Sequence, residues 1–238
     1  MRRLIAWLSN PTETHIAFDI VARGYEAITG QAHWDASARR FARWLPATPR
    51  PRVLDLGAGP ANSSLALLAA RPDARVVALD RAPAMVRLAR EAASHRDGLA
   101  VVLGDAAALP FPAATFDLAT GHSFLYLVPQ QERVLAEARR VLRYGSYVAF
   151  LEPAAGRVTL GAWARLVRGG ARFFISMVGW RLFSGLHGRW TEDSLRAALE
   201  AAGFSDVITE SSFEGLGLLA AARRDARVLT YSGRSCNM

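Results

Sequence analysis

The segment VLDLGAGPA, residues 53–61, carries the strongest structural signal in this chain. An apolar run reaches Asp55 and Leu56, and a glycine-containing turn then leads into a helical pattern. Glycine at 57 and 59 lets the backbone adopt positive φ angles and come close to a ligand. The segment therefore predicts a strand, a tight turn and a helix that together hold a nucleotide.

The spacing of the glycines indicates which nucleotide binds. The dinucleotide fingerprint has glycine at the first, third and sixth positions of the turn, but the sixth position counted from Gly57 is Asn62. Asp55 also stands two residues before the turn. This pattern resembles motif I of the class I S-adenosylmethionine (SAM)-dependent methyltransferases, with Ala61 in place of the third glycine common in that motif.

Composition excludes several classes of enzyme. The chain has 238 residues, 51% of them hydrophobic, which is enough for one sizeable domain. All 29 basic residues are arginine, so Schiff-base chemistry, pyridoxal phosphate and a P-loop lysine are excluded. The single cysteine, Cys236, makes a disulfide framework, a zinc cluster or a thiol nucleophile inside the fold implausible, and we expect no metal site and a cytoplasmic protein.

The net charge of +8 is compatible with nucleic acid, anionic lipid or an acidic substrate as partner. The arginines are scattered rather than gathered in one basic run, which argues against a nucleic-acid partner. The first eight residues are basic and then apolar, but this apolar run is too short for an export signal or a membrane span.

Strand and helix patterns alternate through the middle of the chain and predict a parallel sheet with helices on both faces. We expect strands at 52–56, 75–79, 100–103, 116–120, 147–151, 206–209 and 216–222, the last two as a closing hairpin. We expect helices at 62–70, 83–94, 129–142 and 191–202. Asp55, Asp80 and Asp105 recur every 25 residues, which places all three carboxylates at the carboxyl edge of the sheet.

The predicted fold is α/β and Rossmann-like, with a seven-stranded, mainly parallel sheet. An N-terminal helical lid covers residues 1–48, and the nucleotide-binding domain covers 49–223. Residues 154–190, after the fifth strand, form a helical cap insertion that is longer than a usual connection, and 224–238 form a tail.

The resemblance to class I methyltransferases covers residues 50–223 and implies SAM as cofactor and S-adenosylhomocysteine as product. It implies that Asp80 accepts hydrogen bonds from the ribose hydroxyls, that Asp105 and Ala106 meet the adenine edge, and that Asp55 lies under the amino-acid end. The implied cofactor-binding residues are Tyr25, Asp55, Gly57, Gly59, Asp80, Arg81, Met85, Asp105, Ala106, Gly121 and His122. Tyr25 belongs to a segment similar to the entry motif of small-molecule and quinone methyltransferases, and an ordinary packed aromatic is the alternative.

His122 is the candidate catalytic residue, because an imidazole can accept a proton at neutral pH. The alternative is that it only shapes the pocket for the methionine part of SAM. Substrate-binding candidates are Phe124, Tyr126, Glu152 and Trp163. For Glu152 an acid in a surface turn is the competing interpretation.

The insertion is densely aromatic and rich in arginine, and it has three interpretations. It is a cap over an apolar substrate, a peripheral membrane contact through residues 160–187, or a dimer contact or additional core. Monomer and homodimer therefore both remain possible.

Taken together, the residues and the resemblance predict SAM-dependent methyl transfer to an oxygen, carbon or nitrogen of a hydrophobic small molecule, such as a quinone, polyketide, terpenoid or lipid-like compound. The competing hypotheses are an NAD-dependent oxidoreductase and a non-catalytic SAM-binding protein. A methyltransferase for base amines is disfavoured, because the Asn-Pro-Pro-aromatic tetrad is absent after the fourth predicted strand.

Overall fold

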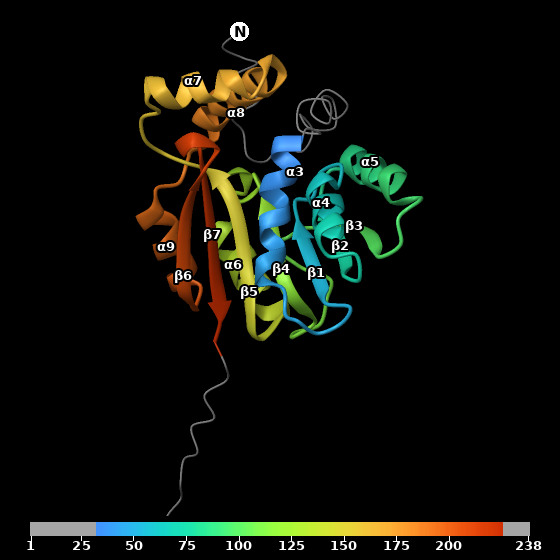
Figure 1. The fold of residues 1–238 in the computed structure, drawn as a ribbon. Helices are drawn as coiled ribbons and strands as arrows, with labels where there is room; N and C mark the ends of the chain where they lie inside the picture. The colour runs from blue at the N-terminus through green and yellow to red at the C-terminus, as the bar shows by residue number, and fades with distance from the viewer. Residues whose placement is uncertain (1–31, 226–238) are drawn as a thin grey trace, which may run out of the picture.

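One seven-stranded sheet organises residues 32–225, the part of the chain that the computed structural model describes (Figure 1). The strand order is β3-β2-β1-β4-β5-β7-β6. The strands are β1 (Arg52–Leu56), β2 (Arg75–Asp80), β3 (Leu99–Leu103), β4 (Phe116–His122), β5 (Leu142–Pro153), β6 (Phe204–Ser212) and β7 (Gly217–Arg224). Only β7 runs antiparallel to its neighbours, so the predicted seven-stranded, mainly parallel sheet is confirmed.

Helices pack on both faces of the sheet, as predicted. The helices are α3 (Ala32–Arg39), α4 (Asn62–Ala70), α5 (Pro83–Ala93), α6 (Gln131–Val141), α7 (Leu160–Arg168), α8 (Ala171–His187) and α9 (Glu192–Ala201), with short 3-10 turns at Arg40–Trp44, Leu125–Leu127 and Phe213–Gly215. Leu54 and Leu56 of β1 pack with α6 and α9, whereas Val53 packs with α3 and α4. Burial on both faces explains why the strand reads as a continuous apolar run.

The local signals at helix starts agree with the structure. Pro83 stands at the start of α5, where its missing N–H costs nothing. Thr191 caps α9, its side chain accepting from the Ser194 amide while the Ser194 hydroxyl accepts from the Thr191 amide in return.

Several strands are longer than the sequence pattern predicts. β5 begins at Leu142 and not at the expected residue 147, and the β4–β5 register shifts between Phe116 and Leu118 in this added part of the strand. Such an irregularity interrupts the alternation from which a strand is recognised. β4 continues to His122, which therefore stands on a strand and not in a loop. β7 extends to Arg224, whose buried guanidinium donates to the Arg140 carbonyl at 2.9 Å, so this residue is not part of a tail.

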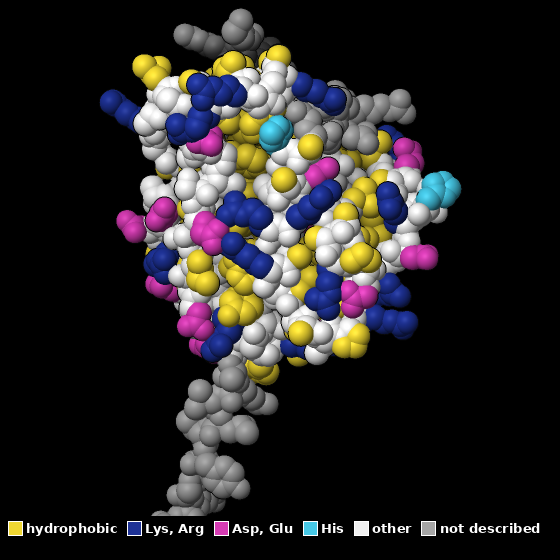
Figure 2. All heavy atoms as spheres, viewed as in Figure 1, with side chains coloured by type: hydrophobic (Ala, Val, Ile, Leu, Met, Phe, Trp, Pro, Cys, Tyr) yellow, Lys and Arg dark blue, Asp and Glu magenta, His cyan; other side chains and the backbone are white. Residues whose placement is uncertain are grey.

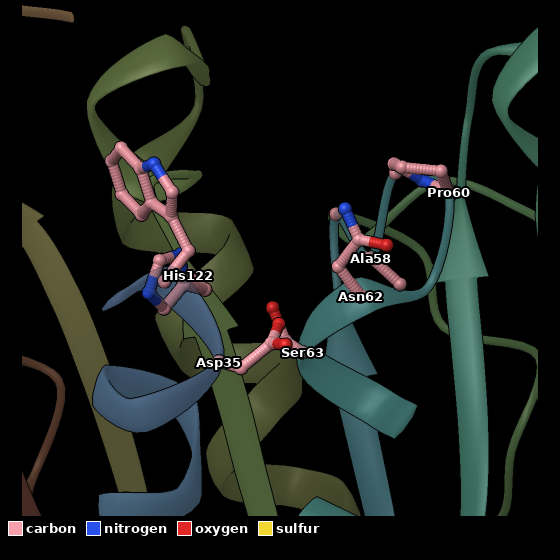
Figure 3. A pocket seen from close by; sticks show the side chains of 9 residues that line it. Asp35, Ala58, Pro60, Asn62, Ser63 and His122 are labelled. Atoms are coloured by element: carbon pink, nitrogen blue, oxygen red, sulfur yellow. The ribbon is translucent and has the colours of Figure 1, made fainter. Parts of the chain in front are cut away.

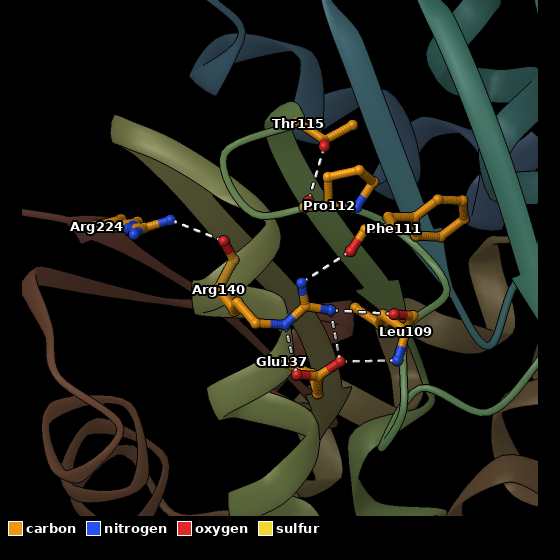
Figure 4. A network of polar contacts seen from close by, with 7 residues as sticks. All are labelled: Leu109, Phe111, Pro112, Thr115, Glu137, Arg140 and Arg224. Atoms are coloured by element: carbon orange, nitrogen blue, oxygen red, sulfur yellow. Dashed lines mark hydrogen bonds and ion pairs between the residues drawn. The ribbon is translucent and has the colours of Figure 1, made fainter.

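Two charged residues of α6 fix the long connection between β3 and β4 (Figure 4). Arg140 donates to the carbonyls of Leu109 and Phe111 at 3.0 and 2.8 Å, and Glu137 accepts from the Leu109 amide at 2.8 Å. Glu137 and Arg140 also form an ion pair at 2.7 Å, and the guanidinium lowers the pKa of Glu137. These contacts hold the connection that begins next to Asp105.

The insertion after β5 forms α7 and α8, which lie at the end of the sheet to which the arrowheads of β1 and β5 point (Figure 1). Its two ends meet, because the Ala155 amide donates to the Trp190 carbonyl at 2.6 Å and the Trp190 amide to the Pro153 carbonyl at 2.9 Å. Arg181 of α8 also donates to the Ala154 carbonyl at 2.6 Å. The insertion is thus a closed unit set on the carboxyl edge of the sheet.

The turn after β1 offers a direct test of how closely the Phe124 ring packs on Gly57. Gly57 has φ +60°, and a Cβ built on it would lie 2.0 Å from Cδ2 of Phe124. We expect Gly57→Ala to lower the free energy of unfolding by about 2–5 kcal/mol, from backbone strain plus overpacking. Urea unfolding followed by circular dichroism measures this loss.

Gly145→Ala is the matched control, since Gly145 has φ +81° but nothing within 4 Å of the position that a Cβ would take. It should cost only the strain of the left-handed backbone, about 1–2 kcal/mol. Equal losses in the two variants would contradict the close packing of Phe124 on Gly57.

Candidate functional site

The turn that follows β1 has an unusual run of left-handed backbone. Gly57, Gly59 and Ala61 have φ of +60°, +54° and +69°. For alanine this conformation costs about 1–2 kcal/mol, so the structure keeps at residue 61 a geometry that suits glycine better. Strain of this kind is typical of functional sites.

Asp80, at the end of β2, ties this turn to the neighbouring strand. Its Oδ2 accepts a hydrogen bond from the Gly59 amide at 2.8 Å, and its Oδ1 accepts one from the Ala82 amide at 2.9 Å. The Ala58 amide also donates to the Leu79 carbonyl at 3.1 Å. The carboxylate is therefore held beside the turn at the carboxyl edge, where the 25-residue recurrence places it.

Asp55 lies beneath the turn and is buried. It accepts hydrogen bonds from the hydroxyls of Ser64 and Thr120 at 2.6 and 3.1 Å, which link β1 to α4 and β4. Burial raises the pKa of Asp55 to about 6, although the two hydroxyl bonds oppose the rise. The partner Thr120 stands opposite Asp55 in the β1–β4 register, a relation that is visible only once the strand order is known.

A pocket opens between this turn, α3 and the end of β4 (Figure 3). Its lining residues are Trp34, Asp35, Gly57, Ala58, Gly59, Pro60, Asn62, Ser63 and His122. Figure 3 shows His122 on one side and Ala58, Pro60 and Asn62 on the other, with Asp35 and Ser63 between them. Burial raises the pKa of Asp35, while Arg39 partly offsets the rise. The structure thus brings three of the cofactor-binding candidates, Gly57, Gly59 and His122, to one pocket.

His122 is a neutral side chain in this pocket. Burial lowers its pKa to about 4. Its Nε2 lies 2.8 Å from the Ser37 hydroxyl, which donates its one hydrogen to the Trp34 carbonyl at 2.7 Å. We therefore assign the hydrogen of the neutral imidazole to Nε2, which donates to Ser37. An imidazole with so low a pKa is a weak proton acceptor at neutral pH.

Aromatic rings from α3, α8 and the turn before β7 cover the same end of β4. The Trp34 ring lies 5.3 Å from His122, 5.2 Å from Trp180 and 4.9 Å from Phe213, each in an edge-to-face arrangement. These rings make an apolar wall above the pocket.

Two indole–serine hydrogen bonds join the insertion to this wall. The Trp180 indole donates to the Ser123 hydroxyl at 2.7 Å, and the Trp34 indole donates to the Ser176 hydroxyl at 3.0 Å. Ser123 directly follows His122 and has φ +57°. Sequence reasoning missed Ser37, Ser123, Ser176 and Trp180 as site residues, because serine carries no spacing signal and Trp180 reads as one more apolar residue of the insertion.

Glu152, at the end of β5, holds the segment after β4. It is fully buried, and its carboxylate accepts from the amides of Phe124, Leu125 and Tyr126 at 3.1, 2.8 and 3.1 Å. Burial raises the pKa of Glu152 to about 7, and the three amides only partly offset this. Glu152 is therefore not an acid in a surface turn, and in this structure it acts on the loop and has no open face toward a substrate.

The remaining acceptor-side candidates do not line the pocket. Phe124 packs its ring against Gly57, and Tyr126 lies edge-on to His187 at 6.3 Å. Trp163 packs on Phe174 at 5.9 Å, between α7 and α8, and does not line the pocket in Figure 3.

The adenine-side candidates follow β2 and β3. Arg81 is exposed, Met85 is buried in a small cluster with Leu88, and the Asp105 carboxylate accepts from the Ala107 amide at 2.9 Å. Ala106 is buried and Gly121 lies within β4. Tyr25 lies outside the described residues.

Glu152 predicts a specific pH dependence of stability. Its pKa is near 4.5 in the unfolded chain and about 7 in the folded protein, so its favourable contribution is present below pH 4.5 and is lost as the pH rises through 7. We expect the stability difference between wild type and Glu152→Gln to fall by up to about 3 kcal/mol between pH 5 and pH 8. Urea unfolding at the two pH values measures it.

Glu132→Gln, on the exposed face of α6, is the control and should show no such change. A difference for Glu152→Gln that stays constant with pH would show that this carboxyl is charged throughout the range.

Part of this chain matches a known protein family. Residues 54–150 match the methyltransferase domain family. The chain is 36% identical over 136 residues to a malonyl-[acyl-carrier protein] O-methyltransferase of Methylococcus capsulatus, covering 57% of this chain and 49% of that protein. It is 30% identical over 186 residues to a rice chloroplastic 2-methyl-6-phytyl-1,4-hydroquinone methyltransferase, covering 77% of this chain and 48% of that protein. The chain thus spans about half the length of these curated relatives.

A solved structure shares the fold. A Haemonchus contortus phosphoethanolamine N-methyltransferase in complex with S-adenosylhomocysteine superposes with a TM-score of 0.66 at 14% identity, over 87% of this chain and 58% of that chain. The family match begins in β1 and continues into β5, so it includes the turn at 57–61, Asp80 and His122. The resemblance seen in motif I is confirmed: residues 54–150 of this chain form a methyltransferase domain of the class I, SAM-dependent type.

Proposed function

We propose that this protein transfers the methyl group of SAM to a hydrophobic small molecule, with a quinone-related acceptor as the favoured class. The observation that carries the proposal is the left-handed turn at 57–61, bonded to Asp80 and facing His122 across a pocket. Relatives named for 2-methyl-6-phytyl-1,4-hydroquinone and for malonyl-[acyl-carrier protein] support small or carrier-linked acceptors.

The residues at the carboxyl edge suit the adenosine part of SAM. Asp80 is oriented by two amides and offers carboxylate oxygens that suit ribose hydroxyls. Asp105 and Ala106, at the next strand end, are the residues we assign to the adenine edge. SAM carries no phosphate, so the absence of a glycine at residue 61 does not weaken the fit.

The pocket in Figure 3 suits the amino-acid end of SAM. Asn62 and Ser63 begin α4, and the amides of a helix N-terminus favour a carboxylate. Asp35, on the facing side, is the carboxylate that we assign to the ammonium group. The two charges of the amino-acid end would thus meet opposite partners on α4 and α3.

When bound, SAM supplies a methyl group on a positively charged sulfur, and the charge is lost as the acceptor attacks. The chain contributes alignment, because holding two reactants at attack distance can supply about 7–11 kcal/mol in favourable cases. The wall of Trp34, Trp180 and Phe213 would exclude water and hold an apolar acceptor. In this proposal His122, which is neutral and bonded to Ser37, shapes the methyl site and does not act as a base. A proton on the acceptor atom must therefore pass to a group other than His122, or the acceptor must be acidic enough to lose it without a base.

Calorimetry with SAM and NAD tests the cofactor assignment. We expect wild type to bind SAM and not NAD, and we expect Asp80→Ala to weaken SAM binding at least about a hundredfold, because hydrogen bonds to a carboxylate are each worth about 1.5–3 kcal/mol. Asp97→Ala, an exposed acid in the turn after α5, should bind as wild type does. Tighter binding of NAD, or unchanged SAM affinity in Asp80→Ala, would contradict the assignment.

Turnover is tested separately, by mass spectrometry of lipid extracts incubated with the protein and labelled SAM. The proposal expects a labelled product one methylene heavier than a hydrophobic precursor. SAM binding with no labelled product from any extract would favour the non-catalytic SAM-binding alternative.

A further inference from the structure

The outer face of the insertion exposes a stripe of large apolar side chains. On α8, Ile175 and Leu182 are 65% and 70% exposed, and Leu186 continues the same face at helical spacing. On α7, Leu160 and Val167 are exposed seven residues apart. Among residues 32–225, most of the strongly exposed large hydrophobic side chains belong to these two helices. Such a patch marks an interaction surface.

Arginines alternate with the stripe residues along the chain, and no acid interrupts this segment. From Pro153 to Thr191 the chain has six arginines and neither aspartate nor glutamate. Arg181 and Arg189 donate to backbone carbonyls, and Arg165 pairs with Glu214, but Arg157 and Arg168 make no ion pair within the described part of the chain. Figure 2 shows arginine and hydrophobic side chains side by side over this end of the molecule. A partner for this face must offer an apolar layer for the exposed leucine, isoleucine and valine side chains and negative charges for the arginines.

The inner face of α8 is committed to the site. Ser176 and Trp180 point inward and bond to Trp34 and Ser123, whereas Ile175 and Leu182 lie on the opposite side of α8. A single helix thus contacts the wall of the pocket on one side and leaves an apolar stripe on the other. Whatever docks on the stripe therefore lies against the helix that bonds to Trp34 and Ser123 at the site wall.

We propose that the outer face of α7 and α8 docks on a bilayer surface that contains anionic lipids. Leucine, isoleucine and valine would enter the boundary between headgroups and acyl chains, while the arginines would reach the phosphate groups. A second copy of this face fits less well, because its arginines would meet arginines. Within residues 32–225, no helix is long and apolar enough to cross a membrane. The inference rests on the proposed function, because docking on a membrane would bring the site to the bilayer in which a lipid-soluble acceptor dissolves.

The test is cosedimentation of the full chain with vesicles of phosphatidylcholine, with and without phosphatidylglycerol. We expect binding to anionic vesicles that weakens with added salt, and much weaker binding to neutral vesicles. The pair Ile175→Gln and Leu182→Gln should reduce the partition coefficient at least about tenfold. Arg157→Gln with Arg168→Gln should reduce binding to anionic vesicles and remove most of the salt dependence.

Leu103→Gln with Ile208→Gln is the matched control, because these side chains are 52% and 46% exposed on strands away from the insertion. It should bind vesicles as wild type does. Calorimetry with SAM on each variant separates this test from that of the proposed function, since SAM affinity should be unchanged. Vesicle binding that is absent in wild type, unchanged in the Ile175 and Leu182 variant, or replaced by a dimer that this variant dissociates, would overturn the proposal.

Discussion

The hydrogen bond from the Gly59 amide to the Asp80 carboxylate is the contact on which the site depends. It joins the turn after β1 to the end of β2, and it requires a backbone that passes through left-handed geometry at residues 57, 59 and 61. Gly57 then leaves room for the Phe124 ring, and Asp55 supports the turn from below through Ser64 and Thr120. The strand order, the glycines of the turn and the buried Asp55 thus together hold the Asp80 carboxylate at the carboxyl edge of the sheet.

Beyond the turn, the site is assembled from segments far apart in the chain. Trp34 and Ser37 come from α3, Ser123 from the end of β4, and Ser176 and Trp180 from α8. The indole N–H groups of Trp34 and Trp180 each find a serine hydroxyl, so these buried polar groups of the apolar wall are satisfied. Glu152 fixes the intervening loop through three amides. The insertion is therefore part of the site wall, and movement of α8 would be transmitted to the residues next to His122.

The sequence predicts the sheet and the turn at its carboxyl edge well, because both depend on local patterns. The strand that contains Asp55, the turn with Gly57 and Gly59, and the acid Asp80 each follow from neighbouring residues. The length of β5 and the position of His122 on a strand do not, since they depend on the register with a partner strand. The buried role of Glu152 cannot be predicted from the sequence either, because its hydrogen-bond partners are backbone amides, which leave no pattern of residue types. The contacts of Ser176 and Trp180 require the packing of α8 on α3.

A crystal structure of the full chain with S-adenosylhomocysteine tests the central claim most directly. We expect the ribose within hydrogen-bond distance of the Asp80 carboxylate and the amino-acid end of the ligand in the pocket between Gly57–Pro60 and Asp35. A ligand bound elsewhere, or no ligand at these positions at saturating concentration, would contradict it.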